Sequence, residues 1–110
     1  MVPQVLVVES YPDLRAGIVA ALRRYSYECD AVATPAAAML KLREHSYAYV
    51  VIDVDSAEYS EAFVAGLDPN ANVILISDDA ADEAQVHRTT LRKPFSRDEL
   101  MERMRALPAA

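Results

Sequence analysis

Residues 49–53 are Tyr49-Val50-Val51-Ile52-Asp53, a short apolar run that ends in a carboxylate. An apolar run of this length is typical of a strand buried on both faces of a parallel sheet. A charge at the end of such a strand is costly to bury unless it has a partner or a purpose. We therefore interpret Asp53 as a functional residue; the alternative is a polar strand end left over from a degenerate site.

Three other predicted strands also end in polar residues: Val5-Leu6-Val7-Val8 precedes Glu9, Val73-Ile74-Leu75-Ile76 precedes Ser77, and Thr89-Thr90-Leu91 is followed closely by Lys93. In a parallel sheet the ligand crevice lies outside the carboxyl ends of the strands. The sequence therefore predicts that two acids, a hydroxyl and an amine converge on one site.

The composition is that of a soluble globular chain. The 110 residues are 53% hydrophobic and 25% charged, which predicts one domain, residues 1–110, around a single core. The net charge of −6 argues against a nucleic-acid surface, which requires clustered basic residues, and we interpret Arg23-Arg24 as a solvated helix end. No apolar stretch approaches the ~20 residues that span a bilayer, and the first residues lack the basic flank of a signal peptide. We expect a cytoplasmic protein.

Helix signals alternate with the strand signals. Helix starts are predicted at Ser10, with Asp13 as a capping-box acid, at Thr34-Pro35, and at Ser96 with Glu99. The predicted helices follow Ser10 as far as Tyr25, run from Thr34 to about His45 and from Tyr59 to Leu67, and follow Ser96 as far as Leu107; residues 78–88 predict at most a short helix. With a further strand at residues 28–33, right-handed crossovers give an α/β fold: a five-stranded parallel sheet with helices on both faces.

Other reactive residue types lack the context of a catalytic site. Gly17 and Gly66 belong to no phosphate-binding glycine motif. Neither His45 nor His87 has a metal-ligand neighbour four residues on, and Cys29 is expected to be a buried, inert thiol. No Ser/His/Asp or Cys/His pairing has the sequence context of a catalytic site, which argues against a hydrolase. We expect a protein that is not an enzyme.

Four of these motifs, taken in order, resemble the receiver domains of two-component response regulators. Residues 5–15 are similar to the acidic first strand and first helix of that family, and residues 49–55 to the strand that carries its phosphoacceptor aspartate. Residues 73–77 resemble the strand that ends in a hydroxyl, and Lys93-Pro94-Phe95 resembles the lysine-proline segment before the last helix. The resemblance covers nearly the whole chain and implies a flavodoxin-like, doubly wound sheet with strand order 2-1-3-4-5.

The resemblance implies a role for each strand-end residue in phosphorelay signal transduction. Asp53 would accept a phosphoryl group from a histidine kinase or phosphotransfer protein, and Mg²⁺ would be bound by the carboxylates of Glu9 and Asp53 and by the backbone carbonyl of Asp55. Ser77 and Lys93 would bind phosphoryl oxygens. Signal output would pass to a downstream protein partner, and the Lys93-Pro94 peptide bond is expected to be cis, as in the family.

Several positions depart from the family pattern. Ser10 stands where receivers commonly have a second acid, which lowers the expected Mg²⁺ affinity. Asp78 follows Ser77 where the family prefers a small residue, and two like charges about 4 Å apart repel by roughly 4 kcal/mol at an effective dielectric near 20. Thr90 replaces the aromatic switch residue, and Ser56-Ala57 replaces the usual Met-Pro.

The spacing of the motifs departs as well. Ser77 lies 77 − 53 = 24 residues after Asp53, and Lys93 lies 93 − 77 = 16 residues after Ser77. Both intervals are several residues shorter than receivers usually show. We therefore expect a shortened third helix, between Asp53 and Ser77, and a shortened fourth helix, between Ser77 and Lys93.

Two hypotheses about function therefore stay open at the level of sequence. The first is a receiver domain that is phosphorylated on Asp53 with Mg²⁺. The second is a pseudo-receiver, a protein-protein interaction module on the same scaffold that is not phosphorylated. Lys93 fits both, because it can bind a phosphoryl group or simply pair with Asp53.

Overall fold

A computed structural model describes residues 4–56, 59, 61–79 and 86–108 of the chain. Its five strands are β1 (Gln4–Val8), β2 (Glu28–Val32), β3 (Tyr49–Asp53), β4 (Asn72–Ser77) and β5 (Arg88–Arg92). They form one sheet of order β2-β1-β3-β4-β5 in which every neighbouring pair is parallel. The predicted α/β fold and strand order are confirmed.

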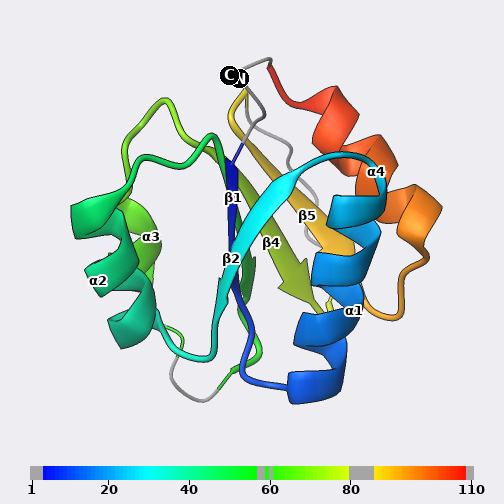
Figure 1. The fold of residues 1–110 in the computed structure, drawn as a ribbon, viewed down its shortest axis with the longest axis horizontal. Helices are drawn as coiled ribbons and strands as arrows, with labels where there is room; N and C mark the ends of the chain where they lie inside the picture. Colours follow the sequence, from blue (N-terminus) through cyan, green and yellow to red (C-terminus); the bar gives the residue numbers. More distant parts are fainter. Residues whose placement is uncertain (1–3, 57–58, 60, 80–85, 109–110) are drawn as a thin grey trace.

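The helices cover both faces of this sheet, as predicted (Figure 1). Their bounds are α1 (Pro12–Arg24), α2 (Pro35–Glu44), α3 (Glu61–Ala65) and α4 (Arg97–Ala106). Helices α1 and α4 pack on one face, and α2 and α3 on the other.

Alternation along the strands divides the core into two clusters. In β1, Val5 and Val7 face α1 and α4, whereas Leu6 and Val8 face α2 and α3. All five residues of β3 are buried, because this strand lies at the centre of the sheet with a helical layer on each side. Residues 49–52 are all apolar because helices cover both faces of β3, as the sequence suggested.

Two of the three predicted helix starts are confirmed. The Thr34 side chain accepts a hydrogen bond from Ala37 N at 3.1 Å, and Ser96 and Glu99 form a complete capping box. The predicted cap at Ser10 is wrong: the N-cap residue of α1 is Tyr11, without a side-chain cap, and Ser10 is exposed. Helix α1 begins one residue later than predicted, with Pro12 at its first position, where the missing N–H costs no hydrogen bond. The carboxylate of the buried Glu9 accepts a hydrogen bond from Tyr11 N at 3.1 Å.

The predicted helix at residues 59–67 is shorter than expected. Helix α3 covers the five residues Glu61–Ala65, with Phe63 and Val64 buried, and Asp68 closes the following turn by accepting a hydrogen bond from Asn70 N at 2.9 Å. This agrees with a shortened third helix. Residues 80–85 lie outside the described part of the chain, so the expected marginal helix between β4 and β5 stays a prediction.

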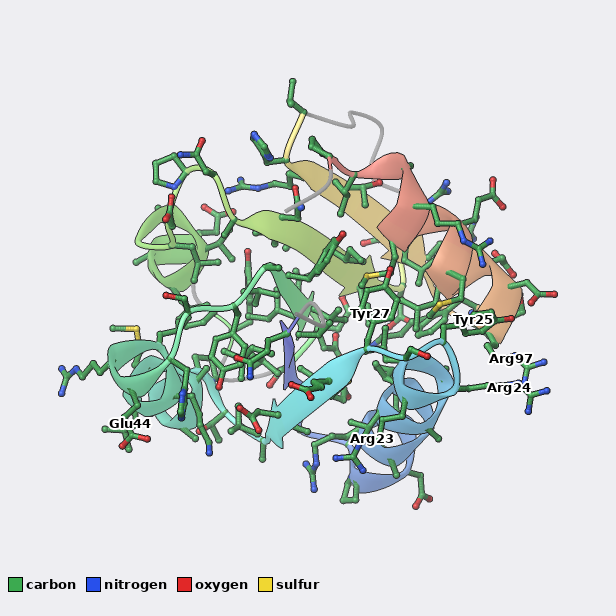
Figure 2. The ribbon with its side chains drawn as sticks, turned by 45° about the horizontal axis from the view of Figure 1, so that its top comes forward. Arg23, Arg24, Tyr25, Tyr27, Glu44 and Arg97 are labelled. Carbon is green, nitrogen blue, oxygen red and sulfur yellow. The ribbon has the colours of Figure 1, made fainter. Side chains whose placement is uncertain are left out.

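Basic side chains gather at the C-terminal end of α1. Arg23 and Arg24 occupy its last turn and point outward to solvent (Figure 2). Cations in this position interact favourably with the negative end of the helix dipole. A solvated helix end, as interpreted from the sequence, accounts for this pair.

Among the described residues, none of the helices is both long and apolar enough to cross a bilayer.

The capping box of α4 offers a test of the fold's local energetics. Substitution Ser96→Ala removes the bond to Glu99 N and is expected to lower the free energy of unfolding by about 1 kcal/mol, measured by urea denaturation. Ser10→Ala is the matched control and should change it by less than about 0.5 kcal/mol, because Ser10 is exposed and does not cap α1. Equal losses in the two variants would contradict the assignment of these caps.

Candidate functional site

The polar residues at the strand ends meet at one edge of the sheet, as predicted. Asp53 and Ser77 are the last residues of β3 and β4, and Glu9 directly follows β1. Lys93 follows β5, where its backbone N donates to Ser77 O at 2.8 Å. Glu9, Asp53 and Ser77 are 1%, 6% and 8% exposed, so the site is built almost entirely from buried polar side chains.

An ion pair joins Asp53, at the end of β3, to Lys93, which follows β5. Lys93 Nζ lies 2.8 Å from Asp53 Oδ2. The other oxygen, Asp53 Oδ1, accepts a hydrogen bond from Asp55 N at 2.8 Å. The peptide bond between Lys93 and Pro94 is cis, as expected. Both oxygens of Asp53 are thus held by groups that stabilise a negative charge.

The side chain of Asp55 also enters the site, which the sequence analysis did not anticipate. One of its oxygens, Oδ2, accepts a hydrogen bond from Asp78 N at 2.6 Å and lies 3.3 Å from Lys93 Nζ. The other, Oδ1, is 3.5 Å from Ser77 Oγ. From the sequence, a role was expected only for the backbone carbonyl of Asp55. The signal that could have pointed to the side chain is an acid two residues after the end of a buried strand.

Burial and charge set the ionisation of these groups. Burial, together with the neighbouring Asp53 carboxyl, raises the pKa of Glu9 to about 7. Burial alone would raise the pKa of Asp53 as well, but the neighbouring Glu9 carboxyl, Lys93 and the hydrogen bond from the Asp55 amide outweigh burial and hold that pKa below its usual range. For Lys93, the two aspartates outweigh burial and raise the pKa. At neutral pH Asp53 and Lys93 are therefore both charged.

Glu9 has one oxygen that is bonded and one that is not. Its Oε1 binds Tyr11 N, whereas its Oε2 is buried and has no hydrogen-bond partner among the described residues. Buried polar atoms are normally satisfied, and an orphaned oxygen beside a second carboxylate is suited to bind a cation.

This donor set fits Mg²⁺, which usually takes one or two carboxylates, a backbone carbonyl and water. Across the residues that the structure describes, no cluster of three or more His, Cys, Asp or Glu side chains has a metal-binding arrangement. The two acids at the predicted metal position are Glu9 and Asp53, since the Asp55 carboxylate is directed toward Lys93. Glu9 and Asp53 therefore supply two carboxylates that could hold the ion, and their role as metal ligands stays a prediction.

The remaining candidate residues lie outside the site. His45 is exposed, and His87 Nδ1 pairs with Asn72 Oδ1 at 3.0 Å, which agrees with surface and packing roles. Cys29 is a free, partly buried cysteine whose pKa is raised to about 11 by burial. The thiol is therefore protonated at neutral pH, as expected of an inert residue.

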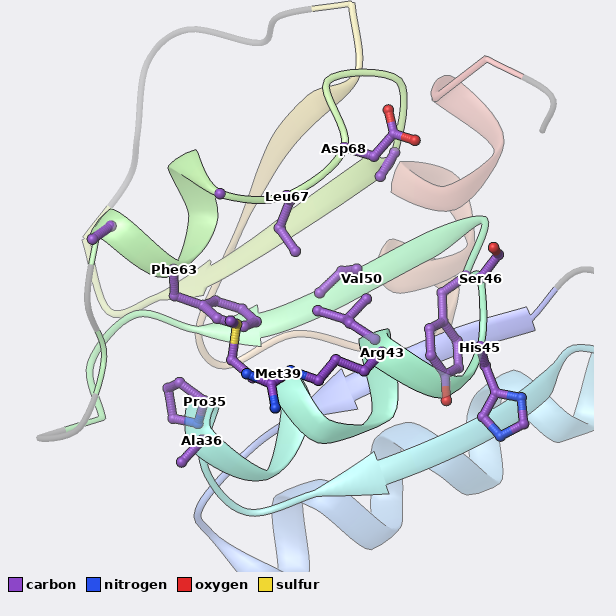
Figure 3. A pocket seen from close by; sticks show the side chains of 15 residues that line it. Pro35, Ala36, Met39, Arg43, His45, Ser46, Val50, Phe63, Leu67 and Asp68 are labelled. Carbon is purple, nitrogen blue, oxygen red and sulfur yellow. The ribbon is translucent and has the colours of Figure 1, made fainter.

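A groove of about 620 Å³ lies away from this chemistry, between α2 and α3 (Figure 3). Met39, Val50, Phe63 and Leu67 contribute to its lining, and none of the strand-end residues does. The apolar groove and the polar cluster are therefore separate features of the fold.

Comparison with known structures identifies the fold. A receiver domain from Methylobacillus flagellatus has a TM-score of 0.80 at 22% identity, covering 96% of this chain and 98% of the other. A chemotaxis response regulator of Vibrio cholerae has a TM-score of 0.83 at 18% identity, covering 97% and 100%. The receiver domain of a Pseudomonas aeruginosa sensor histidine kinase, described with magnesium in its active site cleft, has a TM-score of 0.76 at 21% identity and covers 93% of each chain. No family model and no curated protein sequence matches the chain. At these identities the likeness establishes the receiver-domain fold.

The raised pKa of Glu9 predicts a specific pH dependence of stability. A carboxyl group that titrates near 4.5 when unfolded and near 7 when folded lowers stability as pH rises through that range, because the unfolded state releases its proton first. In Mg²⁺-free buffer, Glu9→Gln removes this loss. The unfolding free energy of the variant, minus that of the wild type, should increase by on the order of 1–3 kcal/mol from pH 5 to pH 8. A difference that stays constant with pH, in urea denaturation at each pH, contradicts the shift.

The ion pair predicts a second result. Lys93→Met leaves Asp53 buried without its cation and is expected to lower the unfolding free energy by about 3 kcal/mol at pH 7. Adding Asp53→Asn to this variant removes the unpaired charge and should restore at least half of the loss. If Lys93→Met alone unfolds at the wild-type urea midpoint with an unchanged slope, the pair does not stabilise the fold.

Proposed function

We propose that this chain, which has the fold of a response regulator receiver domain, accepts a phosphoryl group on Asp53 in two-component signal transduction. The observation that carries the proposal is the contact of 2.8 Å between Lys93 Nζ and Asp53 Oδ2 at the carboxyl ends of the parallel strands. An ionised, buried carboxylate beside a fixed ammonium group has the two properties that an acyl-phosphate site requires: a nucleophile and a cation for the incoming charge.

The donor would be a phosphohistidine of a histidine kinase or phosphotransfer protein, since receiver domains of sensor histidine kinases share this fold. An oxygen of Asp53 forms a bond to phosphorus while the bond from phosphorus to the donor nitrogen breaks. That nitrogen keeps the bonding electron pair and, once protonated by solvent, leaves as neutral histidine. Lys93 neutralises charge on the phosphoryl oxygens, and the hydroxyl group of Ser77 donates a hydrogen bond to one of them.

Glu9 and Asp53, with the backbone carbonyl of Asp55, would hold Mg²⁺. When bound, the ion would supply positive charge to the transferring group and to the two carboxylates. The orphaned oxygen of Glu9 supports this assignment, because a cation there would satisfy it and favour its ionised form.

Acetyl phosphate tests the reaction without a kinase. With millimolar Mg²⁺, intact mass should increase by one phosphoryl group in the wild type and not in Asp53→Asn. The matched control is Asp13→Asn, an exposed acid in the first turn of α1, which should be modified like the wild type. The pseudo-receiver hypothesis predicts no phosphoryl incorporation in any of the three proteins, and that outcome would remove the proposal.

Removal of the metal tests the role of Glu9. Phosphoryl incorporation should stop in EDTA and return with Mg²⁺. Glu9→Gln should raise the Mg²⁺ concentration needed for half-maximal rate by about tenfold or more, because one of two anionic ligands loses its charge. An unchanged Mg²⁺ requirement in this variant would exclude Glu9 as a ligand.

A further inference from the structure

We propose that the carboxylate of Asp55 is a built-in occupant of the phosphoryl position, so that it must leave before Asp53 can be phosphorylated. This inference rests on the proposed function and adds a regulatory feature to the same site. It comes from the contacts of one side chain that the receiver chemistry does not itself require.

Asp55 already uses the donors that a phosphoryl group would need. Three donors lie at the edge of the sheet where β3, β4 and β5 end: the ammonium group of Lys93, the hydroxyl of Ser77 and the backbone N–H of Asp78. Each of them lies next to an oxygen of Asp55, at 3.3, 3.5 and 2.6 Å respectively. A phosphoryl group on Asp53 carries oxygens of the same charge and the same need for donors. The two anions therefore compete for one position.

Asp55 is also held in place. Asp55 N donates to Asp53 Oδ1 at 2.8 Å, and Val54 N donates to Ile76 O at 2.9 Å. These two bonds fix the backbone directly after β3, and the side chain of Asp55 is 30% exposed. Asp55 is thus a positioned part of the site and differs from an acid on a free surface loop.

The charges at the site also oppose the presence of both anions at once. Lys93 is shared between Asp53 and Asp55, so a phosphoryl group would have to replace Asp55 as the second anion at this ammonium group. Carboxylate and phosphoryl group repel each other at such distances. Displacement of Asp55 also breaks its bond to Asp78, which links the segment after β3 to the segment after β4. Phosphorylation would therefore release a connection that exists in the resting protein.

The test compares Asp55→Ala and Asp55→Asn with the wild type and with Asp13→Ala. The control removes the same charge from an exposed residue of α1, near the same edge of the sheet. The first readout is binding of inorganic phosphate, followed through the backbone amide signals of Asp78 and Asp79. The second is the rate of phosphoryl incorporation from acetyl phosphate with Mg²⁺, by intact mass. Thermal unfolding checks that each variant is folded.

Asp55→Ala should bind phosphate at least tenfold more tightly and be phosphorylated at least tenfold faster than the wild type. Asp55→Asn, which is uncharged but fills the space, should lie between them, and Asp13→Ala should match the wild type. Equal phosphate affinity in the wild type and both Asp55 variants overturns the inference, as does an equal gain in Asp13→Ala. If phosphate binding tightens as expected but none of the proteins is phosphorylated, the occupancy by Asp55 stands and the proposed function fails.

Discussion

The contact between Lys93 and Asp53 is the interaction on which the site depends. It joins residues 40 positions apart in the sequence, and it forms because β3, β4 and β5 run parallel and end at the same edge. Asp53 is almost fully buried, and a buried carboxylate without a cation would destabilise the fold or become protonated. Lys93 helps to keep this acid ionised, which is the state that the proposed phosphoryl transfer would require.

The other groups adjust to that pair. Glu9, Asp53 and Asp55 bring three carboxyl groups to a confined region, and like charges at short range favour protonation of the most buried one. Glu9 is 1% exposed, and its pKa is the one that rises, to about 7. Asp55 relieves the repulsion differently, because it turns toward the ammonium group and the amide of Asp78. Asp53 is balanced by Lys93, and Glu9 by a proton or a metal ion. Asp55 is balanced by the Lys93 ammonium group, which it shares with Asp53, and by the amide of Asp78.

The predictions that failed were local ones. Ser10 matches the pattern of a helix cap, yet Tyr11 is the N-cap residue of α1, because this places Pro12 at the first helical position, where its missing N–H costs no hydrogen bond. Helix α3 stops at Ala65, short of the predicted Leu67. Apolar spacing predicts which face of a helix is buried, whereas its ends depend on the turn that follows.

The sequence by itself determined the sheet, the strand order that its resemblance implied, and the edge at which Glu9, Asp53, Ser77 and Lys93 meet. The sheet and its edge follow from apolar periodicity and from the rule that parallel strands end on one side, whereas the strand order follows from the resemblance to a family. Only the tertiary structure decided where the Asp55 carboxylate points and that one oxygen of Glu9 has no partner among the described residues. The physical reason is that a side chain in a loop is oriented by the donors it finds. For Asp55 those donors come from the ends of β4 and β5, more than 20 residues away in sequence.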